Sequence, residues 1–381
     1  MIIREDKNLR NKQPIILLID GNALVHRAFH GMPELKTKKG QLVNAVYGFT
    51  SALLSSIREF DPKYIVVAWD VGKKTFRTEK FAQYKATRIK APQELYDQFP
   101  LAKEVCKALN IPQFGIQNYE ADDVIGTIAS QISNNKYQIT SVSARPSLDG
   151  NKSQQLNDQN IKFNQKANSQ KLKAIIVTGD MDALQLVNDS VNVYSVARGI
   201  KKAVLYNKEK VQEKYGFNPN QLVDYKALKG DPSDNIPGVP GVGDKTAVNL
   251  IKTFGSIEKL YTYLDEKCQI SNEKLQINSK PVCRQARFQI SKRIKQLLQD
   301  NKEKAFLSKD LATICKDTPL DFRLSDAKVS DYNPKKVEKL FYEFEFKSLL
   351  KRLPQVHQIT EKKPSFIHKI NTISHQQNKL F

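Results

Sequence analysis

Aspartates follow three short apolar runs of this 381-residue chain. The runs IILLI, IVVAW and IIVTG are followed by Asp20, Asp70 and Asp180. Continuous β-branched runs of this length are typical of strands buried on both faces of a parallel sheet. Because the active crevice of such sheets lies outside the carboxyl ends of the strands, the three aspartates are predicted to converge there.

Six further acidic residues occur in three short motifs. The motifs are YEADDV, GDMD and GDPSDN, and they contribute Glu120, Asp122, Asp123, Asp182, Asp231 and Asp234. Each motif also has an ordinary explanation: the acids of YEADDV suit a helix N-terminus, and the other acids suit turns. The first aspartate, in Asp20-Gly21-Asn22, also suits a turn.

Taken together, nine acids at one end of a sheet would repel each other unless cations neutralised them. All the candidate ligands are oxygens, and no His or Cys lies in the motifs, which favours Mg²⁺ or Mn²⁺ over zinc. Two such ions can activate a water and stabilise the leaving oxygen of a phosphodiester. The pattern therefore predicts metal-dependent phosphodiester chemistry.

A basic run directly follows Asp70. Residues 73–90 hold seven Lys or Arg against one acid, with three aromatic residues interleaved. Most charge runs are solvated surface. This one should overhang the acidic site, where cations could hold phosphates and aromatics could stack on unpaired bases.

A glycine-rich turn lies at 238–252, with the sequence GVPGVGDKTAVNLIK. Glycines before a helix leave backbone N–H groups free to bind phosphate without reading sequence. Such a turn alone is a weak signal, but GVxGxG before an amphipathic helix matches the helix-hairpin-helix pattern. We expect Gly238, Gly241, Gly243, Lys245 and Thr246 to bind duplex DNA.

Composition limits the possible classes of protein. The formal net charge is +21, which favours a polyanionic partner, and the hydrophobic share of 40% is that of a globular protein. Cys106, Cys268, Cys283 and Cys315 form no CxxC pair, so structural zinc is not expected. The apolar run near the start is too short for a signal peptide or a membrane span. These features predict a cytoplasmic protein.

The order of elements predicts an α/β domain over 14–203, because strands alternate with helical patterns at 44–60, 92–109 and 122–132. Residues 140–172 are polar and interrupt the pattern as a predicted flexible insertion. From about 204 to 353 the pattern is helical, with no further strand expected. The tail at 354–381 is predicted to be disordered.

Seven blocks of the sequence, in this order, resemble the 5′-nuclease domain of bacterial DNA polymerase I and, more distantly, the flap endonucleases. The blocks are LLIDGNALVHRAFHGMP, VNAVYGFTSALL, TFRTEKFAQYKATR, YEADDVIGTIA, VTGDMDALQLV, YKALKGDPSDNIPGVPGVGDKTA and FEFKSLLKRL. They span most of 14–353. The resemblance implies a PIN-like 5′-nuclease fold with a helical arch at about 72–118 and a helix-hairpin-helix at 236–255.

The resemblance also implies roles for individual residues. Asp20, Asp70, Glu120 and Asp122 would surround a first Mg²⁺, and Asp180, Asp182 and Asp231 or Asp234 a second, with Asp123 shared or behind them. Lys85, Tyr84, Arg77 and Arg88 would line the arch and contact the scissile phosphate and the threaded strand. Arg27, Lys73 and Lys74 would add DNA contacts. Mn²⁺ would substitute for Mg²⁺, and K⁺ would bind at the hairpin turn.

The implied activity is removal of 5′ flaps and RNA primers near junctions, on DNA with flaps, nicks or branches. The sequence departs from the family pattern at 140–172 and about 268–286, and it stops where polymerase I would continue. We therefore expect a stand-alone, monomeric nuclease, associated with the nucleoid and served by a separate polymerase.

Two other functions stay open. An RNA-directed nuclease of the PIN-like group would normally lack the arch and hairpin. A non-catalytic junction-binding protein would keep the basic elements but would not need every carboxylate.

Overall fold

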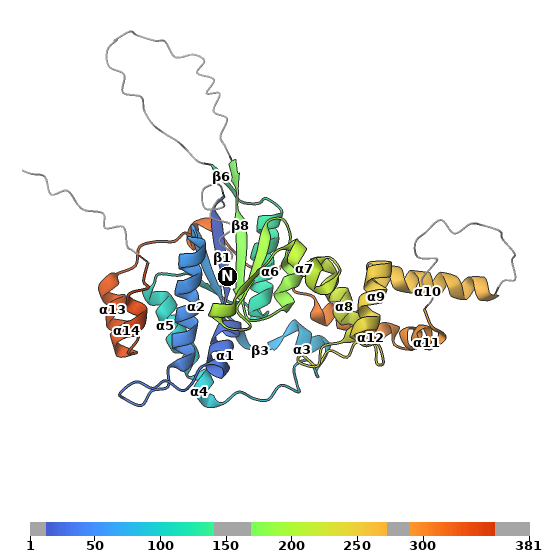
Figure 1. The fold of residues 1–381 in the computed structure, drawn as a ribbon, viewed down its shortest axis with the longest axis horizontal. Coiled ribbons are helices and arrows are strands. Elements are labelled where there is room, and N and C mark those ends of the chain that lie inside the picture. The colour runs from blue at the N-terminus through green and yellow to red at the C-terminus, as the bar shows by residue number, and fades with distance from the viewer. Residues whose placement is uncertain (1–12, 141–168, 273–289, 355–381) are drawn as a thin grey trace, which may run out of the picture.

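The computed structural model describes residues 13–140, 169–272 and 290–354, and Figure 1 shows their arrangement. A layered α/β body carries a helical extension at one end and two C-terminal helices at the other (Figure 1). The expectations for the insertion at 140–172, the second insertion at 268–286 and the tail fall almost wholly outside the described residues.

Six strands form the central sheet, in the order β10-β9-β8-β1-β2-β4. Their bounds are β1 Ile15–Asp20, β2 Tyr64–Ala68, β4 Gln113–Phe114, β8 Lys173–Thr178, β9 Val191–Ser195 and β10 Val204–Tyr206. Every pairing is parallel except β9 with β10. The predicted, mostly parallel sheet is confirmed. The expectation of no strand after 204 is wrong, because Val204 pairs with Ser195 at the sheet edge.

The register of the sheet explains why the aspartates can meet. Asp20 at the end of β1 lies opposite Ala68 of β2, and Ile19 lies opposite Val177 of β8. The carboxyl ends of three neighbouring strands therefore coincide. Asp70 and Asp180 follow two residues after the ends of their strands, at the same edge.

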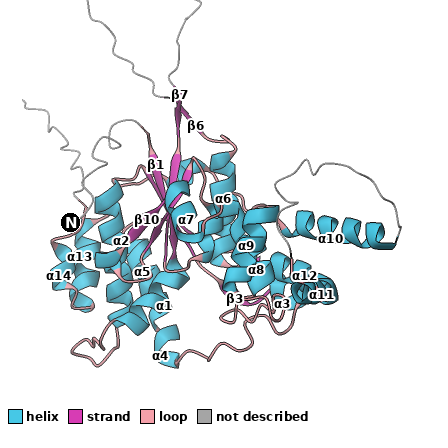
Figure 2. Cartoon of the chain, turned by 45° about the vertical axis from the view of Figure 1, so that its right-hand side comes forward, coloured by secondary structure: helices cyan, strands magenta, loops and turns pink. Residues whose placement is uncertain are grey.

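Side chains of the strands alternate between two cores, since successive residues point to opposite faces. Leu17 and Ile19 join one core, which is covered by α1 Gly21–Gly31, α2 Asn44–Phe60, α5 Gln98–Ala108 and α13 Pro334–Glu343. Ile16 and Leu18 join the other core, which is covered by α6 Ala121–Ser133, α7 Lys208–Tyr215, α8 Leu222–Lys229 and α9 Asp244–Phe254. Figure 2 shows the helices on both sides of the strands.

The helical extension continues from α8 and α9 into three more helices. These are α10 Ile257–Asn272, α11 Lys292–Asp300 and α12 Lys302–Ala312. Most of their buried residues belong to the same core as α6 and one face of the sheet, whereas Leu311 and Ala312 of α12 pack with Tyr84 and Ile236 in a small cluster of their own.

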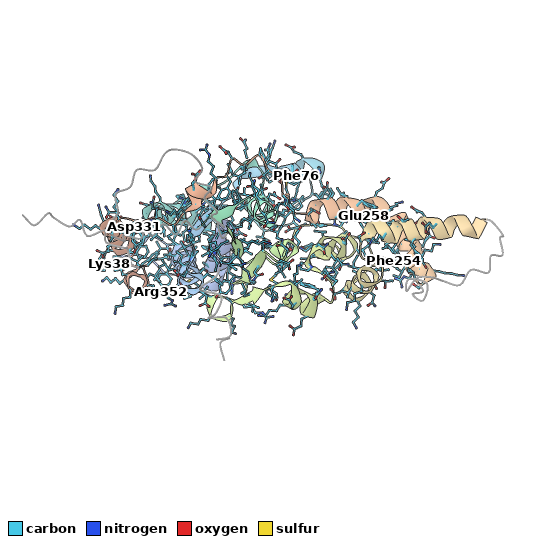
Figure 3. All side chains as sticks on the ribbon, turned by 90° about the horizontal axis from the view of Figure 1, so that it is seen from above. Lys38, Phe76, Phe254, Glu258, Asp331 and Arg352 are labelled. Atoms are coloured by element: carbon cyan, nitrogen blue, oxygen red, sulfur yellow. The ribbon has the colours of Figure 1, made fainter. Side chains whose placement is uncertain are left out.

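The last helices return to the α/β body, although they fall within the helical region predicted from 204 to 353. Phe341 and Phe346, of α13 and the turn before α14 Lys347–Leu350, lie in the core of α2 and α5. Arg352 donates from Nη1 to Ser51 Oγ at 2.8 Å on α2. In Figure 3, Arg352 and Lys38 lie at the end of the molecule opposite Phe254 and Glu258.

The first part of the segment expected to form an arch, before α5, contains little helix. It consists of β3 Val71–Thr75, α3 Phe76–Lys80, a stretch of turns at 82–87 and α4 Gln93–Tyr96. α5, which follows, packs against α2 in the core, and β5 Gln117–Asn118 pairs with β3. The part that stands away from the core is therefore shorter than the expected 72–118.

The polar insertion leaves the sheet far from the aspartates. Its two stems are β6 Gln138–Thr140 and β7 Ser169–Lys171, which pair antiparallel. β7 lies just before the amino end of β8, whereas Asp180 follows its carboxyl end. No helix among the described residues is long and apolar enough to cross a membrane.

Candidate active site

Asp20 links the sheet to the first helix and opens the acidic cluster. Its Oδ1 accepts a hydrogen bond from the backbone N–H of Ala23 at 2.9 Å, which caps α1. Its Oδ2 accepts one from Thr178 Oγ1 at 2.7 Å. Burial, reinforced by the nearby Asp70 and Asp180, raises the pKa of Asp20 to about 7. A carboxyl in this state binds a cation readily once it is ionised.

Asp70 joins the first helix to the start of α6. Its Oδ1 accepts from the backbone N–H of Ala121 at 2.7 Å, and its Oδ2 accepts from Asn22 Nδ2 at 2.8 Å. Asn22 Oδ1 in turn accepts from the backbone N–H of Asp70. These bonds fix the carboxylate at the positive end of a helix dipole.

Glu120 and Asp123 form a capping box at the N-terminus of α6. Asp122 lies between these two residues, and its Oδ1 is buried without a hydrogen-bond partner among the described residues. Burial and the charge of Glu120 raise the pKa of Asp122. An orphaned buried carboxylate oxygen beside other acids fits a site for a hard cation.

Asp180, Asp182 and Asp231 make a second group beside the first. The backbone N–H of Asp182 donates to Asp180 Oδ1 at 2.8 Å. Lys226 of α8 bridges the other two: its Nζ hydrogen-bonds to Asp182 Oδ1 and lies 2.7 Å from Asp231 Oδ2. Burial raises the pKa of Asp182 to about 7. At Asp231, burial is outweighed by Lys226 and the hydrogen bonds from Ser233 together, which lower the pKa to about 2.

Asp234 contacts the basic run at 73–90, which is called the basic segment from here on. It hydrogen-bonds to Arg88 Nη2, and its Oδ2 is 3.9 Å from Lys85 Nζ. Lys85 Nζ also donates to Glu120 Oε1 at 2.7 Å, and Tyr84 Oη donates to Glu120 Oε2 at 3.2 Å. Burial lowers the pKa of Lys85, but the two carboxylates outweigh it and raise the pKa overall, so the ammonium stays charged.

The backbone adds to this arrangement. Lys85 has a positive φ of 56°, and its N–H donates to the carbonyl of Asp234 at 2.9 Å. The loop with Asp234 therefore fixes the basic segment where its cations meet the acidic cluster.

Arg77 lies elsewhere than expected. Its side chain is 2% exposed, and it pairs with the fully buried Asp123 through two hydrogen bonds of 2.7 and 2.8 Å. Its remaining donors reach the carbonyls of Leu311 and Thr313. This environment suits support of the site from behind and leaves Arg77 little access to a phosphate. Asp123, expected to be shared between the ions or to lie behind the other acids, is fully buried against Arg77.

The glycine-rich hairpin between α8 and α9 contains two kinds of glycine. Gly238 is buried with φ 62°, and its N–H donates to Ser308 Oγ at 2.9 Å, so this N–H is not free for phosphate. Gly241 and Gly243 are exposed, and Gly243 precedes a first turn of α9 that no side chain caps. Lys245 is exposed on that turn, with Thr246 half-buried beside it.

The other basic residues expected to bind DNA lie in two places. Arg27 of α1 lines a cleft of ≈ 510 Å³ together with Asp180, Asp182, Lys226 and Lys229. Its Nε is buried and lacks a partner among the described residues. Lys74 is exposed on β3, the strand that also contains Lys73.

The geometry thus brings all nine predicted carboxylates into one connected cluster from five segments of the chain. Within the described ranges, no three of them already surround a common point as ligands of one ion. Lys85, Arg88 and Lys226 lie between several of them and occupy their oxygens. Cations binding there would have to compete with these side chains.

Sequence reasoning missed Lys226 and Asn22. Lys226 lies in YKALKGD, five residues before Asp231. The available signal was a lysine on a predicted helix that leads directly into an acidic loop. In the sequence, Asn22 belongs to Asp20-Gly21-Asn22, which suits an ordinary turn. Only the structure shows that its amide reaches Asp70, which is 48 residues away.

Two family models match this chain. One, described as 5′-3′ exonuclease, N-terminal resolvase-like domain, matches residues 15–146, and the other, described as 5′-3′ exonuclease, C-terminal SAM fold, matches residues 217–335. The chain belongs to the 5′-3′ exonuclease family. The first model includes Asp20, Asp70, Lys85 and Glu120, and the second includes Asp231 and the hairpin.

Similar proteins agree with this family. DNA polymerase I of Bacillus caldotenax is 37% identical over 338 residues, which cover 89% of this chain and 32% of that protein. The chain thus spans about a third of the length of the curated relatives it matches.

Solved structures show the same fold. The structure of the T5 D15 protein, co-crystallised with metal ions, matches with a TM-score of 0.53 at 18% identity. The match covers 87% of this chain and 99% of the T5 D15 chain. The catalytic core of Rad2 in complex with DNA substrate matches with a TM-score of 0.50 at 13% identity, and the match covers 91% of this chain and 94% of the Rad2 chain. The predicted 5′-nuclease fold is confirmed.

Proposed function

We propose that this member of the 5′-3′ exonuclease family is a Mg²⁺-dependent nuclease that cuts DNA near 5′ ends, flaps and junctions. The observation that carries the proposal is the meeting of nine carboxylates, from five segments, at the carboxyl edge of a parallel sheet. Burial, together with neighbouring carboxylates, raises the pKa values of Asp20, Asp122 and Asp182, and divalent cations would stabilise their ionised forms.

The residues fit two hard cations. Asp20, Asp70, Glu120 and Asp122 would hold one, and Asp180, Asp182, Asp231 and Asp234 would hold the other, with Mn²⁺ able to replace Mg²⁺. When bound, such ions polarise the scissile phosphate and lower the pKa of water. The buried Oδ1 of Asp122, which has no hydrogen-bond partner within residues 13–140, 169–272 and 290–354, supports this assignment.

The chain's own side chains then position the DNA. The ammonium of Lys85 lies beside Glu120 and Asp234, close enough to stabilise negative charge that develops on the phosphate during cleavage. Arg88, half-exposed next to it, would orient a neighbouring phosphate. The products would be a 5′-phosphate and a 3′-hydroxyl.

The hairpin supplies a second contact with DNA. Backbone N–H groups near Gly241 and Gly243, with the charge of Lys245, would hold duplex phosphates without reading the sequence. The cleft lined by Arg27 and Lys229 also contains Asp180, Asp182 and Asp231, and Lys229 pairs with Asp244 at the start of α9. A duplex bound at the hairpin would thereby direct its 5′ end to the acidic cluster.

Finer features belong to the proposal as well. We infer RNA–DNA primers among the substrates, K⁺ at the hairpin turn, a monomeric state, a cytoplasmic place near the nucleoid and a separate polymerase as a partner. These rest on the family to which the chain belongs, since many of its relatives are DNA polymerases I.

Incubation with end-labelled DNA tests the proposal. A 5′-flap, a nicked duplex and a single strand are compared, each with Mg²⁺ or with EDTA, and an RNA flap serves as a competitor. We expect cleavage of the flap near its junction in Mg²⁺ and none in EDTA. Binding of all junctions without cleavage in any divalent metal would instead favour a non-catalytic junction-binding protein, and preference for the RNA flap would favour the RNA-directed nucleases.

A further inference from the structure

Lys226 occupies the place where the second group of carboxylates would take a cation. Its side chain is 13% exposed, and its Nζ hydrogen-bonds to both Asp182 and Asp231. Asp231 Oδ1 is also satisfied, by the N–H and the hydroxyl of Ser233. One positive charge from within the protein therefore already compensates part of the negative charge of Asp182 and Asp231.

The first group differs. The oxygens of Asp20 and Asp70 accept only from neutral donors, namely backbone N–H groups, Thr178 and Asn22. Among the described residues, no lysine or arginine forms an ion pair with either of them. Asp122 keeps a buried oxygen, Oδ1, that has no hydrogen-bond partner in the described part of the chain. Of the first group, Glu120 is paired with Lys85 and Arg77, but an external cation can reach Asp20 and Asp70 without displacing an ion pair among the described residues. To bind Asp182 and Asp231 together, it must displace the ammonium that both of them share.

We propose that Lys226 is a displaceable counter-ion, which holds Asp182 and Asp231 together until a second divalent cation takes its place. This inference rests on the proposed function, because it assumes that divalent ions bind the cluster. An ammonium and a divalent ion cannot both lie against the same two carboxylates, since like charges at such distances repel strongly. The second ion therefore binds more weakly than the first.

The released side chain has a defined place to go. Lys226 lines the same cleft as Arg27, Tyr225 and Lys229, and a lysine stem has four flexible methylenes. Freed from the carboxylates, its ammonium can reach into that cleft and contact a DNA phosphate. Binding of the second ion and binding of DNA then favour each other, and the coupling is reciprocal.

A Mn²⁺ titration of the full chain without DNA tests the displacement, with free Mn²⁺ counted by electron paramagnetic resonance. The wild-type protein should show a tight and a weaker site. Lys226→Met should tighten the weaker site by about tenfold or more, because two buried carboxylates lose their internal partner. Lys229→Met, one turn further along α8, removes an equal charge that pairs instead with Asp244, and should leave both sites within about twofold.

A second measurement uses the wild-type protein, in case Lys226→Met does not fold. Acylation by an N-hydroxysuccinimide ester, quantified by mass spectrometry, should increase severalfold at Lys226 when Mn²⁺ replaces EDTA, relative to Lys229. Unchanged labelling of Lys226, or equal Mn²⁺ affinities in Lys226→Met and wild type, would overturn the displacement and leave the proposed function standing. Failure of the wild-type protein to bind any Mn²⁺ would overturn both.

The coupling to DNA has its own readout. In Ca²⁺, a flap DNA should bind wild-type protein more tightly than in EDTA, and Lys226→Met should lose about threefold or more of that gain through the missing charged contact. An equal gain in both proteins would contradict a phosphate role for the freed ammonium.

Discussion

Arg77 and Asp123 form a two-pronged ion pair with no access to solvent: Nη1 lies 2.8 Å from Oδ2 and Nη2 lies 2.7 Å from Oδ1. The pair ties the start of the basic segment to the first turn of α6. Because Arg77 also donates to carbonyls at the end of α12, and Asp123 accepts from the backbone N–H of Cys315, three distant segments meet at one point. Lys85 and Glu120 lie on two of these segments.

Breaking this pair should therefore destabilise the protein. Arg77→Met leaves Asp123 buried and unpaired, which costs about 3–5 kcal/mol. Lys80→Met is the matched control on the same segment, since the Lys80–Asp310 pair is half-exposed and is worth less than about 1 kcal/mol. Urea unfolding checks both values. A loss below about 1 kcal/mol for Arg77→Met would show that the pair is not what holds these segments.

The sequence could predict where the acids gather but not which of them face the cleft. Strand runs ending in Asp20, Asp70 and Asp180 place these carboxyls at one edge, because parallel strands end together. Asp122 and Asp123 are adjacent and chemically identical, so nothing local separates the one with an orphaned oxygen from the one buried against Arg77. That distinction depends on α12, almost two hundred residues later.

The same limit explains the other differences. Arg77 belongs to a basic run that looks like one exposed face, and only the tertiary fold buries a single member of it. Val204–Tyr206 is too short for its pattern to be recognised, and it forms a strand because β9 offers an edge. The return of α13 to α5 is a long-range contact with no local signal.

Stability without metal should depend on pH through Asp20. Its pKa rises from 3.8 to about 7 on folding, so its contribution to stability is fully present below pH 3.8 and is lost as the pH rises through about 7. A pKa difference of this size corresponds to about 4 kcal/mol. In EDTA, the free energy of unfolding should fall between about pH 4 and about pH 7, and less steeply in Asp20→Asn.

Divalent metal should remove this trend, because it binds the ionised carboxyl and so favours the folded state at higher pH. Denaturant melts with Mg²⁺ or EDTA at each pH measure the effect. Identical pH profiles for wild type and Asp20→Asn in EDTA would count against the raised pKa.

Gly238 and Gly243 should tolerate alanine differently. A Cβ on Gly238 would lie 2.3 Å from the backbone nitrogen of Gly230, and its φ of 62° disfavours any side chain, whereas a Cβ on Gly243 meets nothing within 4 Å. We expect Gly238→Ala to lower the free energy of unfolding by about 2 kcal/mol or more, and Gly243→Ala by less than about 0.5 kcal/mol. Thermal unfolding with equal losses would contradict the division of the hairpin.

Lys245→Glu should weaken duplex binding equally for all sequences. The residue is exposed at the start of α9, where a phosphate would lie against the helix N-terminus. Losing a phosphate contact should reduce the slope of log affinity against log salt by about 1. Fluorescence anisotropy over a range of salt concentrations measures this slope. If Lys245→Glu lowers the affinity by the same factor at every salt concentration and leaves the slope unchanged, Lys245 does not contact phosphate.

The most direct test compares cleavage and binding in Asp180→Asn, which keeps the shape of the side chain and removes one negative charge from the cluster. The account predicts that cleavage of a 5′-flap in Mg²⁺ falls at least about 100-fold. Affinity for the same DNA in Ca²⁺ should stay within about threefold, because the hairpin and the basic segment are intact. Cleavage close to the wild-type rate would contradict the claim that these carboxylates act together through shared divalent ions.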